Sequence, residues 1–213
     1  MQKVQINNIN IRNAVISDAE ALQSMFHKYH GTHESFSLDN IKESIETGNV
    51  YIATNEDNHI IGALTSEQVF DNYESDIPDG GIIIGNIQSI GIGDERIWFD
   101  NYIKKEMRDL CVADAYRNRG IASALLEHAL KESKDASYAL VWAPGGKARA
   151  KKLWEEHDFE LQKVVKDIGT LAPWFCENCV ERKNNCNYCE CHVYVEKKPS
   201  KGVELFPAPL LVS

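Results

Sequence analysis

The residues with the clearest chemical potential lie where an apolar stretch ending at Val112 gives way to a basic turn and then to a helical pattern. The first turn of a helix carries unpaired backbone N–H groups and roughly half a positive charge, so it can bind phosphate without side-chain contacts. A glycine there lets a ligand approach the backbone closely. The turn therefore predicts a diphosphate-binding corner made of Arg117, Asn118, Arg119, Gly120, Ile121 and Ala122.

Five of the six cysteines fall within one short window near the end of the chain. Such crowding indicates disulfides in a secreted chain and a metal in a cytosolic one. Cys176 and Cys179 have the spacing of a thiolate pair that holds one edge of a tetrahedral metal. Cys186 with Cys189, or Cys189 with Cys191 on one face of a strand, would supply the second edge. Four thiolates favour structural zinc (Zn2+).

Helical and strand patterns alternate along the chain around these two features. Apolar residues at helical spacing predict helices after Asp18, from Ser37 to Glu46, and from Ile121 onward. Residues 50–53 and 60–64, separated by a polar turn, predict an antiparallel hairpin. A last helix and further strands are predicted over Ala148–His157 and over Ile9–Arg12, Trp98–Val112, Tyr138–Trp142, from Val164 onward, and His192–Glu196.

The 213 residues suffice for one sizeable core. We expect one domain over residues 1–198, including a cysteine-rich metal-binding insertion at 174–192, and a loosely held tail over 199–213. The net charge of −9 disfavours a nucleic-acid partner, because phosphate binding needs a basic surface. Because we find neither a membrane-spanning apolar run nor a secretory pattern, we expect a cytoplasmic protein without membrane contact. Residues 71–93 fit either an added hairpin or an ordered loop.

The basic turn resembles the R-x-x-G-x-A coenzyme-A signature of the GNAT acetyltransferase superfamily, with Arg117, Gly120 and Ala122 at its defining positions. Two further segments resemble the opening strand and helix and the late helix of that family: Ile11–Ala14 with Asp18-Ala19, and Ala150–Phe159. The resemblance implies an α/β (α+β) fold with a mixed, mostly antiparallel central sheet flanked by helices. The metal knuckle would lie between the last two strands.

The resemblance also implies acetyl-coenzyme A (acetyl-CoA) in a splayed cleft between two central strands. Its diphosphate would bind the amides of residues 117–122. The backbone groups expected to pair with the pantetheine arm belong to Leu110, Cys111 and Val112. Lys147 and Trp154 complete the expected cofactor-binding set, with Lys147 and His157 at the surface of their helix.

Catalysis requires an acid beside the departing thiolate. Members of the family often carry a tyrosine for this purpose on the late helix, but here Trp154 stands at that position. An indole N–H is not a useful acid at neutral pH. We therefore expect water or a neighbouring tyrosine, such as Tyr138 or Tyr116, to protonate the thiolate. Cys111 is a further candidate, although its apolar strand suits a small core residue.

Catalysis also requires a base that frees the acceptor amine of its proton. The segment Arg108–Val112 resembles a family strand whose acidic residue faces that amine, which makes Asp109 the first choice and Glu106 the second. Asp158 replaces the glycine that usually precedes Phe159, so the geometry of that turn is open.

We therefore expect an N-acyltransferase that moves the acetyl group of acetyl-CoA to a primary amine of a small molecule or protein by direct attack. The alternative is a non-catalytic acyl-CoA-binding sensor or interaction module, suggested by Trp154 and the metal loop. A homodimer is a possible assembly.

The resemblance also bears on the zinc ligands, because some GNAT-like proteins carry C-x-x-C followed by C-x-C. It leaves Cys186 or His192 spare and favours four ligands: Cys176, Cys179, Cys189 and Cys191.

Overall fold

The computed structural model describes residues 8–68, 82–83, 98–99, 103–133, 136–144, 150–166 and 189–197. Its strands are β1 (Asn10–Asn13), β2 (Val50–Thr54), β3 (Ile60–Gln68), β4 (Ile82–Ile83), β5 (Trp98–Phe99), β6 (Ile103–Val112), β7 (Ala136–Pro144), β8 (Phe159–Val165) and β9 (Cys189–Glu196). Its helices are α1 (Ala19–His30), α2 (Leu38–Glu46), α4 (Ile121–Glu132) and α5 (Lys151–Glu156), with 3-10 turns η1 (Ile16–Asp18), η2 (Glu34–Phe36) and η4 (Asp114–Tyr116). No helix in this described part is long and apolar enough to cross a membrane.

The main sheet has seven strands in the order β1-β2-β3-β6-β7-β9-β8. Neighbouring strands are antiparallel except β6 and β7, which run parallel. The parallel pair needs a crossover connection, which α4 provides between the two strands. The predicted mixed, mostly antiparallel sheet flanked by helices is therefore confirmed.

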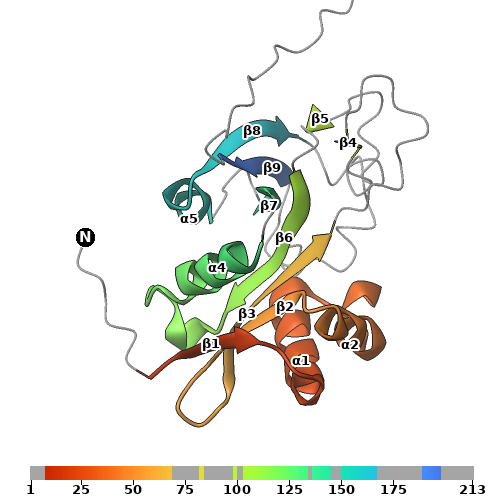
Figure 1. The fold of residues 1–213 in the computed structure, drawn as a ribbon, viewed down its shortest axis with the longest axis vertical. Coiled ribbons are helices and arrows are strands. Elements are labelled where there is room, and N and C mark those ends of the chain that lie inside the picture. Colours follow the sequence, from red (N-terminus) through yellow and green to blue (C-terminus); the bar gives the residue numbers. More distant parts are fainter. Residues whose placement is uncertain are drawn as a thin grey trace, which may run out of the picture.

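Helices cover the two faces of the sheet separately, as Figure 1 shows. On the face that we call the α1/α2 face, apolar residues of α1 and α2 pack on Ala63 and Cys111. On the opposite face, the α4/α5 face, α4 and Trp154 of α5 pack with Leu64 and Met107. Because both faces are covered, β2 is buried along its whole length.

The two central strands pair over only part of their length. The β6–β7 register runs from Ile103 with Ala136 to Met107 with Ala139 and goes no further in the described strands. Beyond it, β6 stays paired with β3 and β7 stays paired with β9. We call this region, residues 108–112 of β6 and 140–144 of β7, the strand separation. It matches the splayed pair of central strands that the sequence predicted.

Several predicted boundaries change in the structure. Val164 and Val165 end β8 instead of beginning a strand, because β8 already starts at Phe159 and pairs with β9 from there. The late helix is shorter than expected, at Lys151–Glu156. The last strand starts at Cys189, three residues before the predicted start at His192.

The long segment before β6 is only partly described. β4 and β5 form a two-residue antiparallel ladder of their own, so the predicted strand Trp98–Val112 is divided between β5 and β6. The remainder of residues 71–93, most of the insertion 174–192 and the tail 199–213 lie outside the described residues. Expectations about them stay predictions.

Candidate active site

The glycine-containing corner between β6 and α4 has the predicted form. Gly120 is the residue immediately before α4 and has φ +81° and ψ 5°, a left-handed conformation that glycine adopts without strain. Asn118 is also left-handed, with φ +60°, which asparagine tolerates better than most residues. The corner thereby turns the chain so that the first-turn amides of α4 follow directly. This arrangement suits an anionic ligand.

The two arginines of the corner have different surroundings. Arg117 Nε donates to the carbonyl of Val112 at 3.2 Å, and Arg117 also forms a 2.9 Å ion pair with Asp114. Arg117 therefore contacts residues just before the corner and stabilises its conformation. Arg119 is exposed, and its guanidinium lies 5.3 Å from the ring centre of Tyr116. Of the two side chains, Arg119 is the better placed to contact a ligand phosphate.

At the end of β6, the backbone pairs with β3 on one side and is not in register with β7 on the other side in the described strands. Cys111 pairs with Ala63 and Val112 with Gly62, both of β3. No β7 residue is in register with them in the described strands, because the β6–β7 pairing has ended at Met107. An extended ligand chain could therefore pair with the outer side of residues 110–112. The Cys111 side chain packs on the α1/α2 face, and burial raises the pKa of its thiol to about 12, which suppresses the nucleophilic thiolate.

A bulge in β6 brings two charged side chains to one face. Asp109 has φ +49°, and the pairing register with β3 shifts between Ala63 and Thr65. Such a bulge places an extra residue in one strand and redirects its side chain. Arg108 and Asp109 consequently both lie near the same residue of β3, since Thr65 pairs with Arg108 and donates to Asp109 at 2.7 Å.

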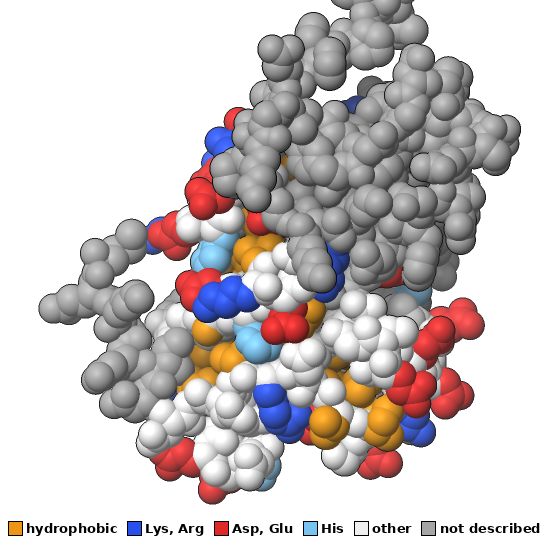
Figure 2. Space-filling model, in the orientation of Figure 1, with side chains coloured by type: hydrophobic (Ala, Val, Ile, Leu, Met, Phe, Trp, Pro, Cys, Tyr) orange, Lys and Arg blue, Asp and Glu red, His pale blue; other side chains and the backbone are white. Residues whose placement is uncertain are grey.

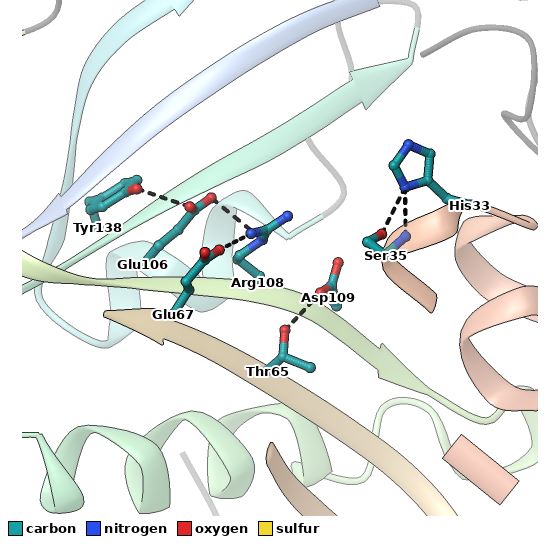
Figure 3. A network of polar contacts seen from close by, with 8 residues as sticks. All are labelled: His33, Ser35, Thr65, Glu67, Glu106, Arg108, Asp109 and Tyr138. Carbon is teal, nitrogen blue, oxygen red and sulfur yellow. Dashed lines mark hydrogen bonds and ion pairs between the residues drawn. The ribbon is translucent and has the colours of Figure 1, made fainter. Parts of the chain in front are cut away.

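A polar network lies beside this bulge, on the α1/α2 face of the sheet (Figure 3). Tyr138 Oη donates to Glu106 Oε2 at 2.9 Å. Arg108 contacts Glu106 at 3.9 Å and forms a close ion pair with Glu67. Figure 3 also places His33, near the start of η2, beyond Asp109 in the same view. The network therefore joins neighbouring residues of β3, β6 and β7 at the start of the strand separation.

Burial governs the proton affinities of the network. Burial raises the pKa of the Glu106 carboxyl, while the Arg108 charge and the Tyr138 hydrogen bond act in the opposite direction. A carboxylate of raised pKa is a better base than an ordinary one. Burial and the Glu106 charge also raise the pKa of Tyr138. What limits Tyr138 as an acid is its hydrogen bond, because its hydroxyl proton is already donated to Glu106.

The late helix differs from its predicted surroundings at one residue. His157 was expected at the surface, but its side chain is only 11% exposed: Nδ1 contacts the Leu153 carbonyl at 2.8 Å, and Nε2 lies 3.7 Å from Glu127 of α4. Asp158 adopts φ +62°, the conformation that glycine would supply at this turn. Lys147 lies outside the described residues.

Two of the four predicted zinc ligands are described. Cys189 and Cys191 are both buried, and as alternate residues of β9 they share one face of the sheet. This arrangement fits two neighbouring ligands of a tetrahedral site, whereas Cys176 and Cys179 lie outside the described residues. Within the described ranges no group of three or more His, Cys, Asp or Glu side chains could hold a metal. The zinc site stays a prediction.

The sequence missed Glu67 and Thr65 as members of the site. Both lie on β3 and enter the network only through the register that pairs Glu67 with Glu106. Strand register depends on which strands meet, and no local pattern encodes it. The signal that could have been used is Asp109, because aspartate tolerates the left-handed conformation better than most residues and is therefore a candidate for a bulge within a strand.

The parted central strands and the glycine-containing corner are the two features that the resemblance to the GNAT family implied, and a comparison with family models gives the family directly. The family model described as "Acetyltransferase (GNAT) domain" matches residues 46–161, more than half of the 213 residues. The chain therefore belongs to the GNAT acetyltransferase family. It is an enzyme of the type that transfers an acetyl group from acetyl-CoA to an amine, as the sequence predicted.

Solved structures share the fold at low sequence identity. Arabidopsis thaliana NAA60 in complex with a bisubstrate analogue has a TM-score of 0.58 and 18% identity, over 88% of this chain and 96% of that chain. Arabidopsis thaliana Naa50 in complex with the bisubstrate analogue CoA-Ac-MVNAL has a TM-score of 0.56 and 14% identity, over 90% and 99%. A GNAT-family acetyltransferase from Bacillus cereus has a TM-score of 0.53 and 19% identity, over 90% and 99%. A comparison with curated proteins found no significant match.

Proposed function

We propose that the acceptor is a cationic primary amine and that Glu106 removes its proton. The observation that carries this proposal is the buried Glu106 carboxylate, 4% exposed, at the residue where β6 and β7 still pair just before they separate. The base must be within reach of the amine that attacks the thioester carbon, and we place that carbon between the parted strands. Asp109, the first choice from sequence, accepts a hydrogen bond from Thr65 and would orient the amine.

The charge around the network supports a cationic acceptor. Three carboxylates, those of Glu67, Glu106 and Asp109, surround the single guanidinium of Arg108. The excess negative charge favours an ammonium ion over a neutral or anionic acceptor. The acceptor would approach from the α1/α2 face, past η2, while the corner before α4 holds the diphosphate of acetyl-CoA through Arg119 and the amides of residues 117–122.

The reaction follows from these positions. The ammonium ion gives up a proton, and Glu106 accepts it directly or through water. The free amine then attacks the thioester carbonyl carbon, the C–N bond forms, and the C–S bond breaks with its electron pair going to sulfur. The sulfur takes a proton to leave as the thiol of CoA. Direct transfer needs no nucleophile from the protein, in agreement with the raised pKa of the buried Cys111 thiol.

The test is turnover by the full chain with acetyl-CoA and a panel of amines, followed through release of free thiol. The panel should include peptides with a free α-amine, because Naa50 was solved with an analogue that joins CoA to the sequence MVNAL. It should also include lysine-containing peptides and small diamines. Glu106→Gln should lower kcat by about 100-fold or more, the size of a general-base contribution. Glu46→Gln, on the exposed side of α2, is the matched control and should leave kcat unchanged.

The acid side of the pH profile tests the identity of the base. The base works deprotonated, so kcat/KM should fall as pH drops through the pKa of Glu106. Tyr138→Phe removes a hydrogen bond that lowers this pKa, so the fall should begin at higher pH. Glu67→Gln removes a negative charge that raises it, so the fall should begin at lower pH. A profile that ignores both substitutions would show that Glu106 is not the base, and Asp109→Asn would be the next variant.

Turnover also separates the enzyme from the alternative reading as a sensor. Tight binding of acetyl-CoA with no acceptor-dependent thiol release across the whole amine panel would favour a non-catalytic acyl-CoA-binding module. A cytoplasmic location, a homodimer and the lack of a nucleic-acid partner stay predictions from the sequence.

We also propose that Cys189 and Cys191 bind zinc together with Cys176 and Cys179. Their shared, buried face on β9 supports this pairing over Cys186 with Cys189. Bound zinc would hold the segment before β9 to the sheet and would do no chemistry on the substrate. Zinc content of the purified protein, measured by atomic emission, should be about one ion per chain in the wild type and in Cys111→Ser, and should be lost in Cys191→Ser. A zinc-free wild type would overturn the proposal.

A further inference from the structure

Besides Ser137 Oγ near the start of β7, three buried polar atoms on the α4/α5 face have no hydrogen-bond partner among the described residues: Trp154 Nε1, His192 Nδ1 and Tyr194 Oη. Their residues are 4%, 9% and 0% exposed, respectively. Burying a polar group without a partner is unfavourable, so native proteins rarely leave such groups unpaired. Three of them on one face indicate a polar ligand that binds there.

Tyr194 lies at the level where the central strands separate. On β9 it is directly opposite Ala139 of β7, and Ala139 is the last β7 residue in register with β6. His192 lies one step further along, opposite Val141. Tyr194, Ala139 and Trp154 belong to the same cluster of packed side chains beneath α4 and α5. The Tyr194 ring is therefore next to the strand separation, on the side where the family resemblance places Trp154.

The neighbouring strand β7 has small, buried side chains on this face. The four β7 residues that share the face of Tyr194 are all small: Ser137, Ala139, Val141 and Ala143. Figure 2 shows hydrophobic side chains between the positions of α4 and α5, flanked by charged and histidine side chains. Small apolar side chains beside a large phenol suit a flexible chain with a polar end.

The other candidate proton donors are occupied or distant. Tyr138 donates its hydroxyl proton to Glu106 on the α1/α2 face. The Tyr116 hydroxyl meets Asn55 at 3.4 Å, beside the corner and far along β6 from the start of the separation. The Cys111 thiol packs on the α1/α2 face. Of the described tyrosines near the separation, Tyr194 is the one whose hydroxyl has no partner among the described residues.

We propose that Tyr194 is the proton donor to the departing thiolate of CoA, so that the tyrosine absent from α5 is replaced by one on β9. This inference rests on the proposed function. As the C–S bond breaks, its electron pair goes to sulfur, and the Oη proton of Tyr194 passes to that sulfur to give the thiol. The phenolate regains a proton from solvent after CoA leaves, and the proton that Glu106 took from the amine returns to solvent as well.

The surroundings keep this phenol protonated before the reaction. Burial and the nearby Glu155 carboxylate raise the pKa of Tyr194, so the hydroxyl is a donor throughout the neutral pH range. Trp154 Nε1, the other donor of the set, is not an acid at these pH values. It is available to hydrogen-bond a carbonyl of the pantetheine arm.

The test compares two tyrosine-to-phenylalanine variants with opposite expectations. Tyr194→Phe removes a buried hydroxyl without a described partner, so Tm should stay the same or rise. Its kcat should fall by about 100-fold, as expected for loss of a general acid. Tyr51→Phe removes a hydroxyl that accepts a 3.0 Å hydrogen bond from the buried Lys105, so Tm should fall while kcat stays close to the wild type.

A binding measurement makes the test independent of turnover. Calorimetry should show that the wild type binds CoA more tightly than desulfo-CoA, which lacks the sulfur, and that Tyr194→Phe abolishes the difference. Tyr194→Phe with kcat within about twofold of an active wild type would overturn the proposal. An unchanged preference for CoA over desulfo-CoA would also overturn it. A wild type that keeps the CoA preference but turns over no amine would contradict the proposed function and leave the Tyr194–sulfur contact standing.

Discussion

Gly62→Ala should weaken both the fold and acetyl-CoA binding, because the new Cβ meets α4 where that helix begins. The Cβ would lie 3.1 Å from Ile121 Cγ2, 3.1 Å from Leu125 Cδ1 and 3.3 Å from the Cys111 carbonyl oxygen. These distances are a few tenths of an ångström shorter than ordinary contacts. The Cys111 carbonyl is main chain of β6 and cannot rotate away, so the new Cβ cannot move toward β6, and the Ile121 and Leu125 side chains of α4 must give way instead.

The magnitude follows from the cost of overpacking a core. One extra methyl group in a close-packed core costs about 1 to 3 kcal/mol. For a chain of 213 residues this corresponds to a fall in Tm of about 2 to 12 °C. Ile121 is the first residue of α4 and follows Gly120 of the corner, so the same shift should raise the Kd for CoA severalfold.

The matched control is Gly48→Ala, which strains the backbone without touching α4. Gly48 has φ +74°, and nothing lies within 4 Å of its added Cβ. The substitution should cost about 1 to 2 kcal/mol through left-handed strain alone and should leave the Kd for CoA unchanged. Thermal unfolding and isothermal titration with CoA measure both quantities. Equal Kd values for the two variants, or a Gly62→Ala protein as stable as the wild type, would refute the reasoning about α4.

Three further predictions concern single side chains. Cys111 should resist alkylation in the native protein at pH 8, because a pKa of about 12 leaves roughly a thousandfold less thiolate than an ordinary cysteine has. Peptide mapping after treatment with iodoacetamide measures the labelling of Cys111, and fast labelling would contradict this prediction. Asp18→Asn should cost about 1 kcal/mol at pH 7, because Asp18 pairs with Arg12 at 2.7 Å and the guanidinium lowers the pKa of this carboxyl. A carboxyl whose pKa is lowered by folding adds stability at pH values above its pKa in the unfolded state. The difference between wild type and Asp18→Asn in the free energy of urea unfolding should therefore vanish as the pH falls toward 2. A difference that does not change with pH would disprove the ionic cause. Asp158→Val should cost about 1 to 2 kcal/mol and Asp158→Gly less than about 0.5 kcal/mol, because φ is +62°; equal thermal stability of the two variants would count against this.

The features that the sequence predicted best depend on neighbouring residues. The helix that begins at Ile121 follows from its apolar period, and the corner before it follows from a glycine between a strand and a helix. The hairpin of β2 and β3 follows from two apolar runs around a polar turn. In these cases all the residues that form the pattern lie in one short segment of the sequence, so the helix or hairpin can be predicted without knowing the fold.

The predictions that changed are those in which a distant partner decides the outcome. β8 extends back to Phe159 because β9 pairs with it there, although residues 160–163 alternate only weakly. His157 is largely buried because α5 packs toward α4, where Glu127 contacts it. In both cases the local sequence is compatible with several states, and tertiary pairing selects one.

From the sequence by itself, the charge, glycine and helix start at residues 117–122 predict a diphosphate-binding corner, and the resemblance of these residues to the GNAT coenzyme-A signature implies the class of enzyme. Only the tertiary structure supplies the observations behind our proposals that Glu106, and not Asp109, is the base and that Glu67 and Tyr194 belong to the site. The physical reason is that proton affinity depends on burial and on charges from other strands: Glu106 is buried between Glu67 of β3 and Tyr138 of β7, and neither contact can be read from the chain.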